Sequence, residues 1–245
     1  MLLYGNGGHA KVITDCLKSV GIAVSGIFDD KLDLSENHLA SGQYNETKQA
    51  DQQLVISIGS NQTRKKISQQ IKHTFGKAVH VSATISQTAT INEGTVIFHQ
   101  VIVQAGATIG KHVILNTRSI IEHDCQVADF VHIAPNVTVC GGVKIGEGTL
   151  IGASATILPN LSIGKWVLIG AGMTITKDVP DFAVIKSNEP HKPISNPTFS
   201  ENEQIYLSPP HLSGSEIKYI KKAIDTNWVS TVGENITDFE QEICR

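Results

Sequence analysis

The sequence has little of what marks several protein classes. Aromatic side chains make up only 5% of its 245 residues, charged side chains 18%, and the net charge is −3. Without a basic surplus, neither a nucleic acid nor an anionic membrane surface is expected as a partner. The four cysteines form no CxxC pair and no disulfide-framework spacing. The longest apolar stretches, such as residues 166–176, are too short to span a bilayer.

The first residues are consistent with this picture. Met1–Gly5 reads as a β-strand and lacks the charged flank and long apolar core of a signal peptide. Together with the unpaired cysteines, this leads us to expect a reduced, cytoplasmic setting.

A six-residue repeat organises the middle of the chain. Every sixth residue from Val79 to Ile175 is aliphatic, which makes seventeen consecutive hexads, and the pattern is flanked by His73 and Asp181. One obligatory aliphatic residue in six predicts a parallel β-helix, in which three hexads form one triangular coil. A β-sandwich has no reason to keep this period over about a hundred residues. We therefore expect a left-handed β-helix over residues 77–180, associated as a trimer.

Residues 1–76 follow another pattern. Short apolar runs at 2–4, 24–28 and 54–58 read as strands, and residues 10–19 and 62–73 have helical spacing. This alternation predicts a small parallel sheet in a Rossmann-like α/β domain.

A glycine-rich turn follows the first predicted strand. Gly5, Gly7 and Ala10 satisfy the dinucleotide fingerprint, and Asp29 and Asp30 lie about twenty residues further on. Such glycines let backbone amides approach a diphosphate at a helix N-terminus, while the carboxylates accept from ribose or base. The motif indicates a nucleotide diphosphate without saying which one. The alternative is a tight turn that binds nothing.

Two histidines of the repeat region are candidates for chemistry. His123 follows the inward-facing Ile121 by two residues and is flanked by Glu122 and Asp124. A neighbouring carboxylate can raise the basicity of an imidazole and fix its tautomer, as a general base requires. His132 lies half a coil further along, and we expect both histidines to reach a cleft between neighbouring β-helices. An exposed polar residue in a turn is the alternative for His123.

Several motifs together resemble a known family. They are NTRSIIEHDC at 116–125, DFVH at 129–132, CGGVKIG at 140–146, YGNGGH at 4–9, and IGSN at 58–61 ahead of Arg64, Lys65 and Lys66. Over roughly residues 1–190 the chain resembles the nucleotide-sugar N-acetyltransferases of the UDP-N-acetylbacillosamine type, which are sialic acid O-acetyltransferase-like, hexapeptide-repeat proteins.

The resemblance implies a role for particular residues. His123 resembles the catalytic base of this family and Asp124 the acid that tunes it, although the family has Glu at that position. His132 would lie near the acetyl group of acetyl-CoA, and Ala153 and Ala171 would contact CoA through their backbones. The remaining matches form the nucleotide-sugar site: Gly7, Gly8, His9, Asp29, Asp30 and Gly59. The family's Gly-x-Pro-Ala-Lys ending is replaced here by IKSNEP at 185–190.

The implied reaction is acetyl transfer from acetyl-CoA to the amine of a nucleotide-linked amino sugar. A UDP-4-amino-4,6-dideoxy sugar is expected, in the synthesis of surface glycans or of glycosylated protein. The amine attacks the thioester directly, with no metal and no covalent intermediate. O-acetylation of sialic acid or another sugar hydroxyl is an alternative. Less expected are a zinc hydratase of the γ-carbonic-anhydrase type, which needs three histidines at a subunit interface, and a nucleotide-sugar-binding scaffold without catalysis.

The last part of the chain differs from the rest. Residues 181–204 are expected to form a cap and a linker, and residues 205–245 resemble the opening of the PLP-dependent nucleotide-sugar aminotransferases. The PLP lysine is not included, so no PLP is expected here. An aminotransferase would make the amine that the acetyltransferase consumes, which suggests a shortened fusion and an aminotransferase as a pathway partner. A helical tail packed on the trimer is the alternative.

Overall fold

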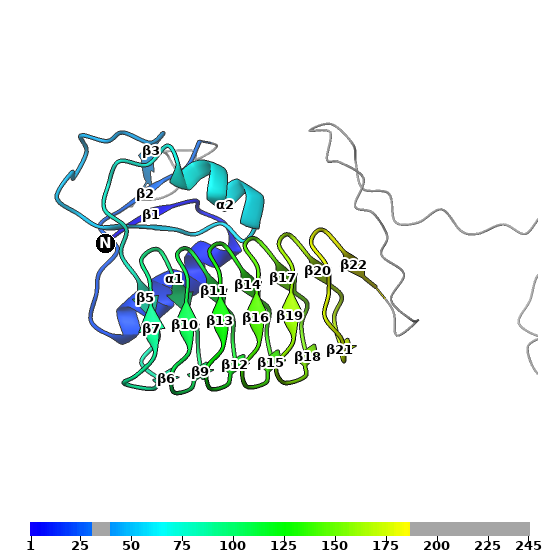
Figure 1. Cartoon of the computed structure of the whole chain (residues 1–245). Coiled ribbons are helices and arrows are strands. Elements are labelled where there is room, and N and C mark those ends of the chain that lie inside the picture. The colour runs from blue at the N-terminus through cyan, green and yellow to red at the C-terminus, as the bar shows by residue number, and fades with distance from the viewer. Residues whose placement is uncertain (31–39, 187–245) are drawn as a thin grey trace, which may run out of the picture. The chain divides into compact units, whose positions relative to one another are not determined.

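The computed structural model describes residues 1–30 and 40–186. An N-terminal α/β domain comes first and a β-helix follows it (Figure 1). The domain consists of β1 Leu2–Tyr4, α1 Gly8–Ser19, β2 Gly26–Phe28, β3 Ala40–Gly42, β4 Leu54–Ile56 and α2 Asn61–Ser68. Its strands are parallel in the order β3-β2-β1-β4. The predicted β-α-β alternation is confirmed, whereas β3 was not expected.

The second helix is shorter than predicted. α2 ends at Ser68, so the helix expected over 62–73 is wrong at its C-terminal end. Beyond Ser68 the backbone forms hydrogen bonds outside the helix. The Lys72 amide donates to the Tyr44 hydroxyl (2.8 Å), and the Thr74 carbonyl accepts from the Leu54 amide (2.9 Å). These bonds hold the segment alongside β4 and Tyr44, and backbone groups that are used in this way cannot also form the hydrogen bonds of a continued helix.

The hexad repeat forms a triangular prism with three parallel sheets. Face 1 has seven strands: β5 Ala78–Val79, β8 Val96–Ile97, β11 Ile114–Leu115, β14 His132–Ile133, β17 Leu150–Ile151, β20 Leu168–Ile169 and β22 Val184–Ile185. Face 2 has six: β6 Thr84–Ile85, β9 Ile102–Val103, β12 Ile120–Ile121, β15 Thr138–Val139, β18 Thr156–Ile157 and β21 Thr174–Ile175. Face 3 has five: β7 Thr90–Ile91, β10 Thr108–Ile109, β13 Gln126–Val127, β16 Lys144–Ile145 and β19 Ser162–Ile163. The chain visits the faces in this order, so each coil has a corner 1–2, a corner 2–3 and a corner 3–1.

The strand register confirms the eighteen-residue coil. Ile114 pairs with His132, and His132 pairs with Leu150, eighteen residues on in each case. The hexad aliphatics are buried from Ile97 onward. The last coil is shorter, because Leu168 pairs with Val184, only sixteen residues away. This loss of two residues explains why the hexad pattern stops at Asp181, although β22 continues the β-helix beyond the boundary expected at residue 180.

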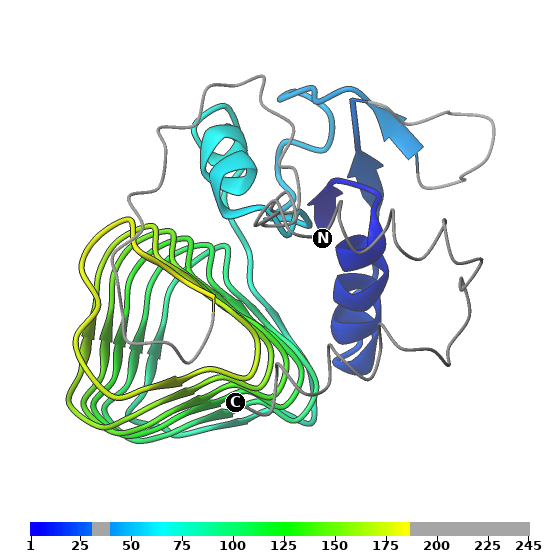
Figure 2. The same cartoon turned by 90° about the vertical axis from the view of Figure 1, so that its right-hand side faces the viewer.

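The N-terminal domain packs on face 1. Apolar residues of α1, among them Ile13 and Leu17, share one core with Ala78, Val96 and Ile114, which form the outer row of the first three coils on that face. Figure 2 shows the triangular cross-section with α1 alongside one of its sides. The next residue of this outer row is His132, so the sheet carries a functional candidate where the apolar contact with α1 ends.

No helix within residues 1–30 and 40–186 has the length and apolar character needed to cross a membrane. Of the cap and linker expected over residues 181–204, residues 187–204 lie outside the described residues, and so does the aminotransferase-like segment 205–245.

Candidate active site

The start of α1 offers open backbone groups. Gly7 is the N-cap and makes no side-chain capping bond, and the first turn holds no acidic residue. A Cβ placed on Gly7 or Gly8 would meet no heavy atom within 4 Å. The first amides of a helix have no partner within the helix and carry a partial positive charge. The two glycines therefore leave both space and donors for an anionic group, as the fingerprint predicted.

The two carboxylates after β2 hold this turn in place. Asp29 Oδ2 accepts from the Asn6 amide (2.7 Å), and Asp30 accepts from the Tyr4 hydroxyl, with both oxygens at 3.1 Å. Burial and then the bond to Asp30 raise the pKa of Tyr4 to about 12, so this hydroxyl stays a donor at neutral pH. Both aspartates thus border the open glycine turn, where the sequence placed the nucleotide-sugar site.

His9 and His132 come together on face 1. Their ring centroids are 5.7 Å apart at an interplanar angle of 75°. Gly59 makes room for this arrangement, since a Cβ there would lie 2.7 Å from His9 Nε2. His132 Nε2 lies 3.2 Å from Asn116 Nδ2, and His9 Nδ1 is buried without a hydrogen-bond partner among the described residues. Two residues that the resemblance assigns to different ligands, the sugar nucleotide and CoA, therefore lie side by side.

Both imidazoles are held neutral. Burial, followed by the charge of Arg64, lowers the pKa of His132 to about 4, and a backbone hydrogen bond with Gly59 acts in the opposite direction. The pKa of His9 is lowered by the same two causes in the same order. A neutral imidazole has one donor and one acceptor nitrogen. His132 uses both nitrogens within the chain, because Nε2 faces the donor Nδ2 of Asn116 and the ring donates to the Gly59 backbone, whereas His9 Nδ1 has no such partner among the described residues. His132 is also too weakly basic for a general base at neutral pH.

Arg64 of α2 is the charge behind these shifts. It is 1% exposed, and all five of its N–H groups donate to oxygen acceptors. The acceptors are His112 O at 2.8 Å, Phe130 O and Asn61 Oδ1 at 2.9 Å, and Ile58 O and Gly59 O at 3.1 Å. The guanidinium thus joins the loop before α2 to corner 3–1 of two successive coils. Burial lowers its pKa to about 9, which leaves it a cation at neutral pH.

The predicted base lies elsewhere. His123 and Asp124 are at corner 2–3, between β12 and β13, with side chains 64% and 74% exposed. His123 Nδ1 lies 2.9 Å from Asp124 Oδ2, which leaves Nε2 free. A Cβ on Gly141, one coil further, would lie 2.5 Å from Nε2, and a Cβ on Gly106, one coil earlier, would lie 2.6 Å from Asp124 Oδ1. Glycines on both neighbouring coils thus make room for the pair.

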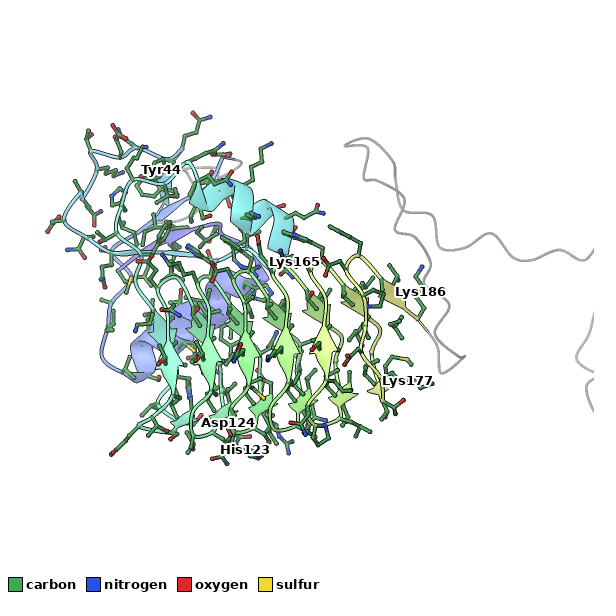
Figure 3. All side chains as sticks on the ribbon, viewed as in Figure 1. Tyr44, His123, Asp124, Lys165, Lys177 and Lys186 are labelled. Atoms are coloured by element: carbon green, nitrogen blue, oxygen red, sulfur yellow. The ribbon has the colours of Figure 1, made fainter. Side chains whose placement is uncertain are left out.

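Within one chain the candidate residues lie on different sides of the prism. Corner 2–3 is the corner opposite face 1, so His123 lies away from His9 and His132. Figure 3 shows His123 and Asp124 at the edge of the prism remote from Tyr44 of the N-terminal domain. Ala153 and Ala171 lie at corner 1–2, in successive turns joined by a bond from the Gly172 amide to Ala153 O (2.8 Å). That His123 and His132 face one cleft stays a prediction, which requires a second copy of the chain.

Sequence reasoning missed three contributors to this geometry. Arg64 was quoted only as part of a basic run, and charged helix residues are normally exposed. Asn116 and Gly141 belong to the motifs that resemble the family, but no function was predicted for either of them. The eighteen-residue register could have found Gly141, because adding one coil to His123 gives that position. No comparable signal marks the burial of Arg64, which depends on how α2 docks.

Comparison with known proteins gives two family matches. Residues 1–71 match the PglD N-terminal domain, and residues 142–177 match the bacterial transferase hexapeptide repeats. The acetyltransferase domain of PglB from Neisseria gonorrhoeae is 30% identical, with a TM-score of 0.71 over 79% of this chain and 98% of that domain. PerB from Caulobacter crescentus, solved with CoA and GDP-perosamine, is 28% identical, with a TM-score of 0.70 over 75% of this chain and 91% of that one.

Two curated relatives from Bacillus subtilis match over shorter stretches. A UDP-N-acetylbacillosamine N-acetyltransferase is 34% identical over 108 residues, which is 39% of this chain and 49% of that protein. A protein named as a pyridoxal phosphate-dependent aminotransferase, EpsN, is 43% identical over 42 residues, 17% of this chain and 11% of EpsN. The chain therefore spans about half the length of the first of these relatives and about a tenth of the second.

Proposed function

Because the chain belongs to the hexapeptide-repeat sugar N-acetyltransferases that carry a PglD-type N-terminal domain, we propose that it transfers the acetyl group of acetyl-CoA to the amine of a nucleotide-linked amino sugar. The observation that carries the proposal is the open start of α1 beside the His9–His132 pair. The helix amides, the two aspartates and His9 offer partners for the diphosphate, the ribose and the sugar. PerB, which has a similar fold, was solved with CoA and GDP-perosamine.

The N-terminal domain supplies the nucleotide end of the site. The amides after Gly7 bind the diphosphate, and Asp29 and Asp30 accept from the ribose or the base. His9, through its unpartnered Nδ1, faces the sugar end. A Cβ at Gly8 would enter the space that the diphosphate occupies, which is now open.

His123 is the general base. Asp124 holds Nδ1, so Nε2 is the atom that accepts a proton from the sugar amine as the amine attacks the thioester carbonyl. A new C–N bond forms, the C–S bond breaks, and the proton passes to the departing sulfur. The neutral His132 and the backbones of Ala153 and Ala171 position the acetyl-CoA. A backbone amide donates to the carbonyl oxygen, on which negative charge develops.

The chain works as a homotrimer in this proposal. A single copy places His123 at corner 2–3, opposite the face that carries His9 and His132. A neighbouring copy must therefore supply the base, and closed threefold symmetry repeats the same contact three times. Each complete site then contains corner 2–3 of one chain and face 1 of the next.

The substrate proposed first is a UDP-linked 4-amino-4,6-dideoxy sugar, for surface-glycan or glycoprotein synthesis. An aminotransferase that installs the 4-amino group is the reaction that must precede this one. The relatives' names cover both UDP and GDP sugars, so the nucleotide is part of the test.

The test measures thiol release from acetyl-CoA with UDP-, GDP-, dTDP- and CMP-linked amino sugars, and confirms the product by mass. We expect acetylation of at least one amino sugar and no acetylation of the matching sugar with a hydroxyl in place of the amine. The H123A variant, measured alongside, should remain trimeric and lose most of the activity. Transfer to hydroxyl sugars alone would contradict N-acetylation, and no transfer to any acceptor would contradict the proposal.

A further inference from the structure

A cluster of nitrogen and oxygen ligands lies where α1 meets the first two coils of the β-helix. Asp15 belongs to α1, whereas His80 and His99 lie at corner 1–2 in successive coils. One ligand atom from each of the three lies within 4.8 Å of those from the other two. Among residues 1–30 and 40–186, this is the one group of three or more His, Cys, Asp or Glu side chains gathered so closely.

The contacts within the cluster are direct. His99 Nε2 lies 3.0 Å from Asp15 Oδ2. The rings of His80 and His99 stack, with centroids 3.6 Å apart and an interplanar angle of 24°. All three side chains are at least partly exposed, so an ion can enter from water. The eighteen-residue register brings His80 and His99 close, because they are one coil and one residue apart, whereas the approach of Asp15 depends on how α1 docks.

The cluster shares no residue with the proposed acetyl-transfer site, although Asp15 follows His9 by six residues on α1, about 9 Å along the helix axis. His99 and Ala153 lie near the same corner but are separated by three eighteen-residue coils. At about 4.8 Å per coil, this is roughly 14 Å along the prism. None of Asp15, His80 and His99 has a role in the proposed reaction, so another reason for the grouping is needed.

The ligand chemistry suits a borderline divalent ion. Two imidazole nitrogens and one carboxylate oxygen are ligands that Zn²⁺ accepts, with water in the remaining position. We propose that Asp15, His80 and His99 bind a divalent transition-metal ion, with Zn²⁺ as the reference ion, and that the ion clamps α1 to the first two coils.

The surroundings of His80 define which nitrogen takes the ion. His80 Nδ1 accepts from the Ser82 amide (3.1 Å) and lies 2.7 Å from Ser82 Oγ, so Nε2 is the nitrogen left for the metal. Ser82 Oγ also accepts from the Gln100 amide (3.0 Å) and has a second lone pair. When Nε2 binds the ion, the ring proton moves to Nδ1, which then donates to Ser82 Oγ and gives up the contact from the Ser82 amide. Ser82 therefore acts as an outer partner that orients the imidazole. At His99, the ion replaces the proton shared between Nε2 and Asp15, and that proton goes to solvent.

We expect a bound ion to stabilise the contact between α1 and the first two coils of the β-helix. The ligands come from α1 and from two successive coils, so the ion ties three segments together. Of these, α1 and the first coil already touch through the Val81 amide and Ser19 Oγ (3.0 Å). An ion that binds only the folded chain raises the unfolding temperature with its free concentration.

The test uses the full chain without a histidine tag, and Zn²⁺ alone as the ligand. Calorimetry should show one ion per chain, and the thermal midpoint should rise with Zn²⁺. The matched variant is H80F, which keeps a ring to stack on His99 and removes the ligand nitrogen. We expect H80F, H99A and D15N each to lower the affinity by about tenfold or more, and S82A by about tenfold. The control H123N removes an exposed histidine beside a carboxylate and should bind Zn²⁺ as the unmodified chain does.

Cobalt spectroscopy identifies the ligands independently of stability. Co²⁺ bound here should give visible d–d bands without a thiolate charge-transfer band, and H80F should abolish the bands. A thiolate band would place the ion at a cysteine and overturn the proposal. Equal Zn²⁺ affinity of H80F, H99A and the unmodified chain, or no binding to the unmodified chain, would overturn it as well.

Discussion

Replacement of Arg64 by leucine should destabilise the fold far more than an ordinary helix substitution. Arg64 donates to five acceptors, and the R64L variant leaves them without that donor, among them the carbonyls of His112 and Phe130 in the prism. An orphaned buried acceptor costs about 1–3 kcal/mol, and release of the buried charge offsets part of the total. We expect the free energy of unfolding to fall by about 3–5 kcal/mol.

The adjacent residue gives a matched control. Lys65 also links α2 to the prism, through an ion pair with Glu147, but their side chains are 36% and 29% exposed. A partly exposed pair of this kind contributes about 1 kcal/mol or less, so K65M should change stability little. Urea unfolding at neutral pH compares the two variants, and proton NMR follows the imidazoles. R64L should also raise the pKa of His132, because it removes a neighbouring cation. A loss in R64L no larger than that in K65M would refute the reasoning.

Other predictions concern the site and pH. G8V should weaken nucleotide-sugar binding by calorimetry while acetyl-CoA still binds; unchanged affinity would remove the diphosphate from the start of α1. H123A should lower kcat by about 10²–10⁴-fold with little change in acetyl-CoA affinity, and a loss of only a few-fold would exclude it as the base. G141A should displace the exposed imidazole and lower kcat without lowering the unfolding temperature; a fully active variant would show that this gap is not needed. The pKa of His112 and of His132 is about 4 in the folded chain against about 6.5 when unfolded, so the unfolded state binds more protons between these values. Stability should therefore be complete above pH 6.5 and decrease by about 3 kcal/mol per histidine as the pH falls to 4, and constant urea midpoints over that range would contradict both shifts.

The β-helix could be predicted in detail because its signal is periodic. One aliphatic residue in six fixes the coil length, and from it follow the three faces and the corner on which His123 lies. The end of the prism could not be placed, since the last coil loses two residues and with them the hexad register. Helix α2 was extended too far because its spacing continues, while hydrogen bonds to Tyr44 and β4 terminate it.

The local part of the candidate site could be predicted from the sequence, whereas the contacts between the two domains could not. The glycine turn at Gly7 and Gly8 is a local motif, and local geometry follows from local sequence. The contact between His9 and His132, and the burial of Arg64 beside them, depend on how the N-terminal domain docks on face 1. No short-range pattern encodes this docking, so residues assigned to two ligands were not recognised as neighbours.

Subunit complementation tests the central claim, that each acetyl-transfer site combines His123 of one copy with the N-terminal domain of the next. H123A lacks the base and G8V binds the nucleotide sugar weakly, so each variant has little activity when the nucleotide sugar is kept well below the KM of G8V. When they are unfolded together and refolded in equal amounts, random trimers should place an intact His123 against an intact Gly8 in about one quarter of the sites. We expect about one quarter of the unmodified activity in the mixture and little activity in either variant refolded alone. A mixture that exchanges subunits and stays inactive would show that both residues must belong to the same chain, and would contradict the account.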